Sequence, residues 1–239
     1  MSILKFLLMP LSWLYLAITS IRNELYDKGL FKSYRFKVKA ICVGNLSVGG
    51  TGKSPMIEYL IKSYKDRYLI AVLSRGYGRQ TKGFVEVKPD MNANDVGDEP
   101  LQFKRKFESI PIFVDADRKH GIDKIQKLYP DVQLVLLDDA FQHRRVKADI
   151  NILLTTHSNP FYKDFVLPAG RLRESRQGKK RADVIAVTKC PQNLSQPEKS
   201  KIKKRINPLP HQQVVFSSIA YSDKVYSEKE ILNFDEFND

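Results

Sequence analysis

A glycine-rich segment near the start of the chain constrains its fold most strongly. The segment reads Val-Gly-Asn-Leu-Ser-Val-Gly-Gly-Thr-Gly-Lys-Ser-Pro over residues 43–55, between an apolar run at 38–43 and helically spaced apolar residues at 56–61. A strand, a glycine-rich loop ending in Gly-Lys-Ser and a helix together form a phosphate-binding P-loop. The backbone N–H groups of such a loop face a polyphosphate, and the helix N-terminus adds about half a positive charge. The segment therefore predicts a phosphate site within an α/β domain.

The residue types in this loop predict its individual contacts. The Lys53 ammonium is expected to reach the outer phosphates, and the Ser54 hydroxyl is expected to ligate Mg²⁺. The remaining cradle positions are Ser47, Val48, Gly49, Gly50, Thr51 and Gly52. Ser47 departs from the usual pattern, which has a glycine at that position. The alternative to a phosphate site is a glycine-rich β–α turn that binds nothing.

A second apolar run ends in two carboxylates. Residues 132–137 are Val-Gln-Leu-Val-Leu-Leu, and Asp138 and Asp139 follow them. This pattern is typical of a buried strand that delivers an aspartate to the Mg²⁺ beside a P-loop. The two motifs together indicate a nucleotide phosphotransferase more specifically than either motif alone.

Further short apolar runs alternate with helical spacing along the chain, at 68–74, 111–115, 149–155, 183–189 and 214–219. Such alternation predicts a doubly wound α/β domain of the P-loop NTPase type with a mostly parallel sheet. Residues 80–96 are expected to form a loop excursion. Ligands bind at the carboxyl ends of the strands in open α/β sheets, so we expect the loop at 74–79, Arg118 and Asp138 at that edge.

The acidic segment Val-Gly-Asp-Glu-Pro at 96–100 precedes a helical pattern. Acidic residues before a helix are often caps, and in a phosphotransferase they equally serve as a base or a metal site. The residues alone leave both interpretations open for Asp98. The segment Thr-Lys-Cys-Pro at 188–191 is similar to the guanine-reading element of GTPases but lacks its aspartate, which argues against a GTPase.

Residues 3–21 form a strongly apolar stretch that contains Lys5 and Pro10. It is short for a transmembrane helix, which needs about 20 apolar residues. A signal peptide, a helix lying in the membrane interface and a helix packed on the domain are the other interpretations. Five basic residues and no acidic one lie between positions 28 and 39. Each such charge near an anionic membrane contributes about 1 kcal/mol, so we favour membrane association.

The net charge of +13 is compatible with nucleic acid, anionic lipid or phosphorylated small molecules. No nucleic-acid motif is present and aromatic residues do not alternate with the basic ones, so we expect no nucleic-acid partner. Cys42 and Cys190 lie far apart in the sequence and indicate neither a disulfide framework nor a zinc site.

Six motifs together resemble one family, the tetraacyldisaccharide 4'-kinases, which phosphorylate a lipid A precursor. The matching segments are the P-loop at 43–55, Ser-Arg-Gly-Tyr-Gly-Arg at 74–79, Val-Gly-Asp-Glu-Pro at 96–100, Asp-Asp-Ala-Phe-Gln-His-Arg at 138–144, Leu-Pro-Ala-Gly-Arg-Leu-Arg-Glu at 167–174 and Val-Thr-Lys-Cys-Pro at 187–191. Ser47 also fits, because this family departs from the general P-loop pattern there. The resemblance implies an ATP- and Mg²⁺-dependent lipid kinase at the cytoplasmic face of the inner membrane.

The resemblance also implies roles for individual residues. Lys53 would contact the transferring phosphate, while Ser54 and Asp138 would hold Mg²⁺. Asp98 would be the base that takes the proton from the sugar hydroxyl, and Asp139 would support the metal and phosphate shell. The nucleotide and substrate cleft would be lined by Arg75, Tyr77, Arg118, Arg173 and Glu174. The partners would be ATP, the lipid A disaccharide precursor and the membrane surface.

The expected organisation has three parts: an apolar helix and basic flank at 1–38, a P-loop kinase core at 39–192, and a linker with the start of a second α/β domain at 193–239. Family members continue well beyond this length, so we expect the second domain to be incomplete. Two other hypotheses stay open: a different P-loop small-molecule kinase or ligase, and an inactive remnant that binds nucleotide or lipid.

Overall fold

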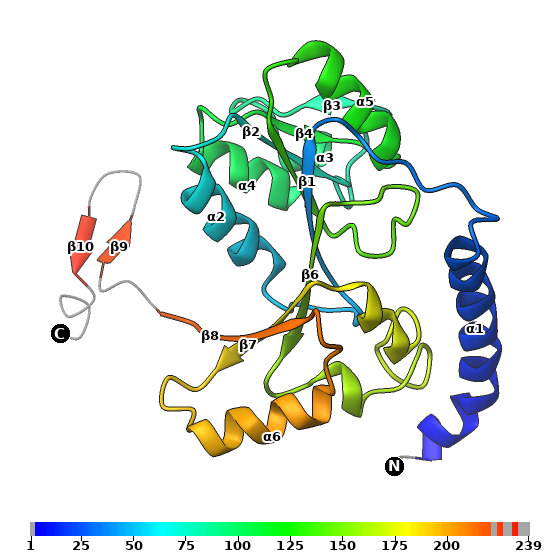
Figure 1. Cartoon of the computed structure of the whole chain (residues 1–239). Coiled ribbons are helices and arrows are strands. Elements are labelled where there is room, and N and C mark those ends of the chain that lie inside the picture. The colour runs from blue at the N-terminus through cyan, green and yellow to red at the C-terminus, as the bar shows by residue number, and fades with distance from the viewer. Residues whose placement is uncertain (1–2, 221–223, 227–230, 234–239) are drawn as a thin grey trace.

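An eight-stranded, mostly parallel sheet runs through the structure, a computed structural model that describes residues 3–220, 224–226 and 231–233. The strand order is β3-β4-β2-β5-β1-β6-β7-β8, and only β3 runs antiparallel to its neighbour (Figure 1). The strands are β1 (Lys39–Asn45), β2 (Ile70–Ser74), β3 (Val85–Glu86), β4 (Ile112–Val114), β5 (Leu134–Asp138), β6 (Ile150–Thr156), β7 (Val184–Cys190) and β8 (Gln213–Ser218).

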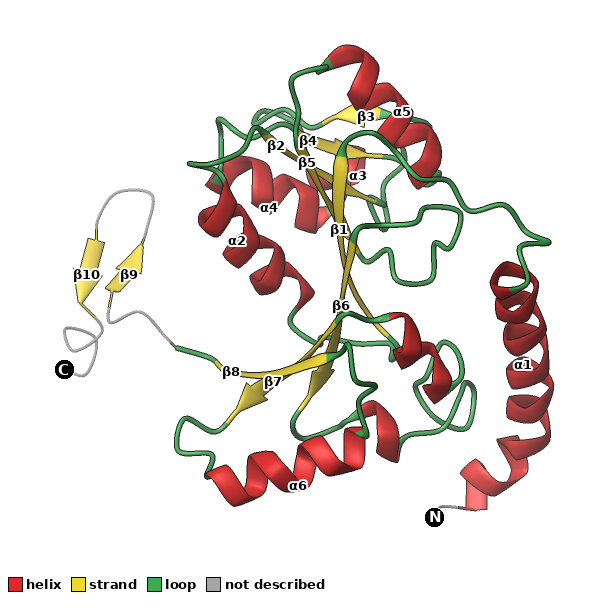
Figure 2. Ribbon diagram, viewed as in Figure 1, coloured by secondary structure: helices red, strands yellow, loops and turns green. Residues whose placement is uncertain are grey.

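Helices cover both faces of this sheet (Figure 2). One face packs against α2 (Lys53–Tyr64), α3 (Ala93–Val96) and α4 (Asp98–Lys106), whose buried side chains include Ile57, Val96 and Phe103. The other face packs against α5 (Arg118–Leu128) and α6 (Gln196–Ile206), while α1 (Ile3–Asp27) lies farther out and contacts the segment that connects β6 to β7. Two 3₁₀ helices, η1 (Phe161–Lys163) and η2 (Arg176–Arg181), lie in the connection between β6 and β7. The prediction of a doubly wound α/β fold is confirmed.

The central position of β1 follows from its sequence. All of its residues after Lys39 are buried, as expected of an apolar strand covered on both faces. β1 pairs in parallel with β5 on one side and with β6 on the other, and Val43 lies opposite Asp138. The strand order diverges on the two sides of β1, so the P-loop after β1 and the carboxylates after β5 emerge together at the carboxyl edge of the sheet.

One expectation about local structure differs from what is observed. Residues 80–96 are not only a loop, because they contain β3 and the short helix α3, which an Asn92–Asp95 capping box starts. The segment after residue 193 contributes α6 and β8, and β8 pairs with β7 in the same sheet. Beyond it, β9 (Lys224–Tyr226) and β10 (Ile231–Asn233) pair as an antiparallel hairpin. The division at residue 193 stays a prediction.

The N-terminal apolar stretch forms α1, which continues to Asp27 and carries Pro10 inside it. One side of the helix is fixed to the segment that precedes η2. The Ser12 hydroxyl donates to the Val166 carbonyl at 3.1 Å and accepts from the Ala169 N–H at 2.9 Å, and the Tyr15 hydroxyl donates to the Arg173 carbonyl at 2.9 Å. Within the described residues, no helix reaches the combined length and apolarity needed to cross a bilayer.

Candidate active site

The P-loop is held from both sides by hydrogen bonds to other segments. The Asn45 side-chain amide donates to the Thr51 hydroxyl at 2.8 Å, and the Thr188 hydroxyl at the end of β7 donates to the Thr51 carbonyl at 2.8 Å. Gly49 and Gly52 have φ angles of 105° and 88°, a region that favours glycine, and Gly52 caps α2. These contacts join the loop to the end of β1 and to β7.

Asp138 is fully buried at the end of β5, beside this loop. The Ser74 hydroxyl donates to its Oδ2 at 2.9 Å, whereas its Oδ1 is buried without a hydrogen-bond partner. Burial raises the pKa of Asp138 to about 6, and the nearby Glu99 and Asp139 carboxylates also raise it. A buried carboxylate oxygen without a partner is costly, so this oxygen is a candidate for contact with a cation.

Asp139 lies in the turn that follows β5, and its carboxylate contacts two cationic side chains. Its φ angle of 44° is left-handed, an unusual conformation for a residue with a side chain. Arg173 Nη1 lies 3.0 Å from both carboxylate oxygens, and Lys53 Nζ lies 3.8 Å from Oδ2. The P-loop lysine and Arg173 thus both contact the Asp139 carboxylate.

Glu99 is a site residue that the sequence analysis missed. The Ser54 hydroxyl donates to Glu99 Oε1 at 2.9 Å, and the Glu99 charge contributes to the raised pKa of Asp138. Glu99 therefore lies beside both predicted metal ligands. Its sequence signal was its place next to Asp98 in the 96–100 motif, but only the packing of α4 against α2 brings it to Ser54.

A cavity of about 870 Å³ opens over these groups. Its lining brings together most of the predicted site residues: Val48, Gly49, Gly50, Lys53, Arg75, Tyr77, Asp98, Asp138, Asp139 and Arg173. His143, Gln142 and Glu99 also line it, and so do three α1 residues that the sequence did not predict, Tyr15, Thr19 and Arg22. The N-terminal helix is thus one wall of the cleft.

Two residues that we expected to line the cleft are buried behind it. Arg118 is 1% exposed, and its guanidinium donates to the backbone carbonyls of Asp115 at 2.9 Å and Asp138 at 3.2 Å. Glu174 is 3% exposed and accepts hydrogen bonds from Asn23, Gln142 and Arg181 at 2.7 to 3.0 Å. The expectation that both side chains line the cleft is therefore wrong. A buried charged group needs polar partners, and these two find them in the surrounding protein.

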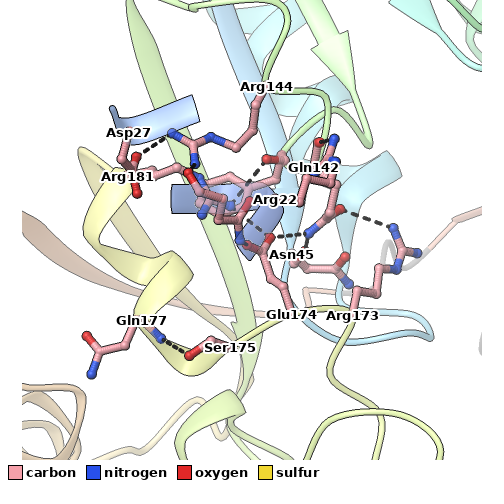
Figure 3. A network of polar contacts seen from close by, with 12 residues as sticks. Arg22, Asp27, Asn45, Gln142, Arg144, Arg173, Glu174, Ser175, Gln177 and Arg181 are labelled. Atoms are coloured by element: carbon pink, nitrogen blue, oxygen red, sulfur yellow. Dashed lines mark hydrogen bonds and ion pairs between the residues drawn. The ribbon is translucent and has the colours of Figure 1, made fainter. Parts of the chain in front are cut away.

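The Glu174 contacts belong to a polar network that connects α1 to the loop after β5 (Figure 3). Gln142 Nε2 donates to Glu174 Oε1 at 3.0 Å and to the Asn45 carbonyl at 2.8 Å, while Arg22 donates to the Gln142 carbonyl at 3.1 Å. Arg144 pairs with Asp27 at the end of α1. The helix, the 138–145 loop and the strand before the P-loop are therefore linked.

The sheet, the loop after β1 and the buried aspartate after β5 define a P-loop nucleotide-binding protein of the NTPase-like α/β class. Comparison with known proteins identifies the family within this class. The chain belongs to the tetraacyldisaccharide-1-P 4'-kinase family (LpxK), whose model matches residues 4–232. The family inferred from the six motifs is confirmed.

Individual relatives agree with this assignment. The tetraacyldisaccharide 4'-kinase of Flavobacterium psychrophilum is 50% identical over 238 residues, which are 99% of this chain and 69% of that protein. The enzyme of the same name from Bacteroides thetaiotaomicron is 50% identical over 90% of this chain and 57% of its own length. The crystal structure of LpxK from Aquifex aeolicus in complex with ATP matches with a TM-score of 0.72 and 30% identity, covering 95% of this chain and 87% of that one.

Proposed function

We propose that this chain carries the catalytic core of an ATP-dependent kinase for the 4'-hydroxyl of a tetraacyldisaccharide 1-phosphate, a lipid A precursor. One observation supports this most: Lys53, Asp98 and Asp138 line a single cleft at the carboxyl edge of the sheet. The names of the family and of its relatives supply the substrate class.

Positioning and neutralisation of charge do most of the work in phosphoryl transfer. The P-loop backbone would cradle the ATP phosphates, and Lys53 would contact the transferring group. Arg75 and Arg173 also line the cleft, and together with the α2 N-terminus they would balance the charge that develops on the phosphoryl oxygens. Asp139 would hold Lys53 and Arg173 in place through its contacts with both.

The residues around Asp138 fit Mg²⁺, which prefers oxygen ligands and is usually bound by one or two carboxylates plus substrate phosphates. Asp138 Oδ1 is buried and free of hydrogen bonds, and the Ser54 hydroxyl and Glu99 carboxylate lie together beside it. In the described residues, no three His, Cys, Asp or Glu side chains gather into a metal site by themselves. When bound, the ion would neutralise phosphate charge; Ser54 and Asp138 would hold it, with Glu99 as an added ligand.

Asp98 is the candidate base. It is exposed to the cleft at the first position of α4, directly after Gly97, whose φ angle of 92° makes the turn into the helix. Its carboxylate would accept the proton of the sugar hydroxyl as that oxygen attacks the phosphorus.

The acceptor is a lipid, and α1 supports a location at the membrane surface. Seven large apolar side chains on α1 are 56–68% exposed: Phe6, Leu7, Leu11, Trp13, Leu14, Ile18 and Ile21. The opposite side of the same helix lines the cleft through Tyr15, Thr19 and Arg22. We propose that α1 lies in the cytoplasmic face of the inner membrane and presents the acceptor to the cleft.

The kinase proposal is tested by transfer of labelled phosphate from ATP to the disaccharide 1-phosphate. Lys53→Ala and Asp98→Asn should each lower the rate by at least about a hundredfold. The matched controls are Lys62→Ala, in the last turn of the same helix, and Asp90→Asn, an exposed aspartate of the preceding segment; both should retain the rate. Full activity of Asp98→Asn would remove the base assignment.

The longer Flavobacterium psychrophilum relative serves as the positive control. If this chain binds ATP and transfers nothing while the relative transfers phosphate, the chain acts as a nucleotide-binding remnant. Phosphorylation of a soluble small molecule instead of the lipid would favour the other P-loop kinase hypothesis.

The membrane proposal is tested by flotation with anionic vesicles. Ile18→Asp should abolish flotation, because it places a charge in the centre of the apolar face. Tyr59→Asp is the matched control, since Tyr59 is a 64% exposed apolar residue on α2. Equal flotation of wild type and Ile18→Asp would contradict the proposed orientation of α1.

A further inference from the structure

The segment Thr-Lys-Cys-Pro at 188–191 has no role in the chemistry proposed above. It overlaps the end of β7, which lies on the side of β1 opposite to β5. Thr188 and Cys190 are buried, whereas Lys189 between them is exposed. The segment therefore presents a cation at the carboxyl edge of the sheet, where ligands bind in open α/β folds.

The backbone is irregular at Lys189. Its φ angle of 55° is left-handed, which is unusual for a residue with a side chain. The pairing of β7 with β8 shifts in register between Val187 and Cys190, at the same place in the strand. Irregularities of this kind change the direction of a side chain and are frequent next to functional sites. The local backbone thus gives Lys189 a direction that a regular strand would not.

Thr188 and Lys189 both approach the P-loop. The Thr188 hydroxyl donates to the Thr51 carbonyl at 2.8 Å, and a Cβ added at Gly52 would lie 3.9 Å from the Thr188 side chain. A Cβ added at Gly50 would lie 3.9 Å from Lys189 Nζ. The Lys189 ammonium therefore lies beside the loop, and its methylene stem extends from the end of β7 to that point.

The charge of Lys189 is available to a ligand. Within the part of the chain that the structure describes, no carboxylate makes an ion pair with its ammonium. Lys53 differs in this respect, because it contacts Asp139 on the cleft side of the loop. The position of Lys189 beside the P-loop is thus not explained by an acidic partner.

The strand order places Lys189 where the nucleoside of a bound nucleotide is expected. Apart from the loop after β1, the strand ends that line the cleft are those at Ser74 and Asp138, which belong to β2 and β5 on one side of β1. β7 lies on the other side, three strand positions from β5, or roughly 14 Å at 4.8 Å per strand. A triphosphate whose reacting end lies near Asp138 and which passes through the P-loop therefore directs its nucleoside toward the end of β7.

We propose that Lys189 binds the nucleoside half of ATP, with its methylene stem along one face of the base and its ammonium beside the P-loop. Lysine stems cover apolar surface while the charged end stays polar, and a cation near an aromatic face is attracted to it. Pro191 occupies the position of the aspartate that reads guanine in GTPases and has no side-chain acceptor, so this contact selects no particular purine. The inference rests on the proposed kinase function, in which ATP is the phosphate donor.

Titration calorimetry with two ligands, ATP and inorganic tripolyphosphate, tests the proposal in the presence of Mg²⁺ and without an acceptor. Lys189→Asn removes the stem and the charge, and asparagine tolerates the left-handed φ of this position. This variant should weaken ATP binding roughly three- to thirtyfold, the range for a cation on an aromatic face. Binding of tripolyphosphate, which has no nucleoside, should not change.

Three further measurements serve as controls. Lys189→Arg keeps a long stem and a cation, so it should retain most of the ATP affinity. Lys53→Ala should weaken both ligands, because Lys53 is expected to contact the phosphates. Lys201→Asn, which changes an exposed lysine of α6, should weaken neither. A denaturation curve of Lys189→Asn establishes that the variant is folded.

The results separate failure of the inference from failure of the kinase proposal. Equal weakening of ATP and tripolyphosphate by Lys189→Asn would overturn the inference, because Lys189 would then act on the phosphates or on the loop. Unchanged ATP affinity of the folded variant would overturn it as well, and so would a loss confined to GTP. A wild-type chain that binds neither ligand would refute the nucleotide site itself. Selective loss of ATP binding together with no phosphate transfer to the lipid would count against the kinase proposal alone.

Discussion

Replacing Asp138 with asparagine should stabilise the ligand-free chain at pH 8 while it abolishes phosphoryl transfer. Asp138 is fully buried, its Oδ1 has no partner, and burial raises its pKa from 3.8 to about 6. At pH 8 the folded chain therefore carries an ionised carboxylate in a place that disfavours the charge. Asparagine has a similar shape and no charge.

The expected gain in stability follows from the difference between the pKa of 3.8 in the unfolded chain and about 6 in the folded chain. Each pKa unit of that difference corresponds to roughly 1.4 kcal/mol. The folded-state pKa lies above the unfolded value, so the stabilising effect of the protonated form is fully present below pH 3.8 and is lost as the pH rises through about 6. The loss at pH 8 is roughly 3 kcal/mol. Because the new amide N–H₂ also needs partners, the net gain for Asp138→Asn should be about 1–3 kcal/mol.

Urea denaturation of the ligand-free chain in a chelating buffer measures this gain between pH 4.5 and pH 8. The gain should shrink to about 1 kcal/mol or less at pH 4.5, where Asp138 is mostly protonated in the folded wild type. Asp139→Asn is the matched control. Asp139 contacts Arg173 and Lys53, so its replacement should destabilise the chain by about 1 kcal/mol at pH 8.

Two outcomes would refute this reasoning. The first is an Asp138→Asn variant that is less stable than wild type at pH 8, which would mean that the buried charge is compensated. The second is a gain that does not change with pH, which would point to packing and not to the ionisation of Asp138.

Three further predictions concern residues outside the reacting groups. Gly44→Ala should lower the free energy of unfolding by about 2 kcal/mol in a urea titration, because the added methyl group would meet Phe141 Cβ at 2.6 Å. Glu174→Ala should cost roughly 3 kcal/mol in the same assay, since it leaves Arg181 without its buried partner, and unchanged stability would contradict the network. Cys42 should resist alkylation at pH 8 in the folded chain and react after unfolding, because burial raises the pKa of its thiol to about 12.

Much of the fold could be predicted from the sequence, for a local physical reason. Strands buried on both faces are continuous apolar runs, and the strand-to-helix transition at the P-loop needs glycines that tolerate a left-handed φ. Both signals lie in a few consecutive residues. The exceptions were β3 and α3, which are two and four residues long, too short for any hydrophobic period to show.

The sequence by itself also supplied candidate groups for the site. The P-loop and the strand that ends in carboxylates indicated Lys53 and Asp138, and the resemblance to the kinase family implied Asp98 and Asp139. The tertiary structure decided which other groups join them. Glu99 reaches Ser54 only through the packing of α4 against α2, and α1 reaches the cleft only through its hydrogen bonds with the segment at 166–173 and the loop after β5.

The same difference between local motifs and tertiary contacts explains why Arg118 and Glu174, which we expected to line the cleft, are buried. Arg118 follows a strand at the binding edge, which predicts exposure to ligand, yet it is buried and bonds to the Asp138 carbonyl 20 residues away in the sequence. Glu174 lies 151 residues from its partner Asn23. A motif specifies which groups are present near an edge, whereas burial and long-range hydrogen bonds decide which of them face the ligand and which hold the site together.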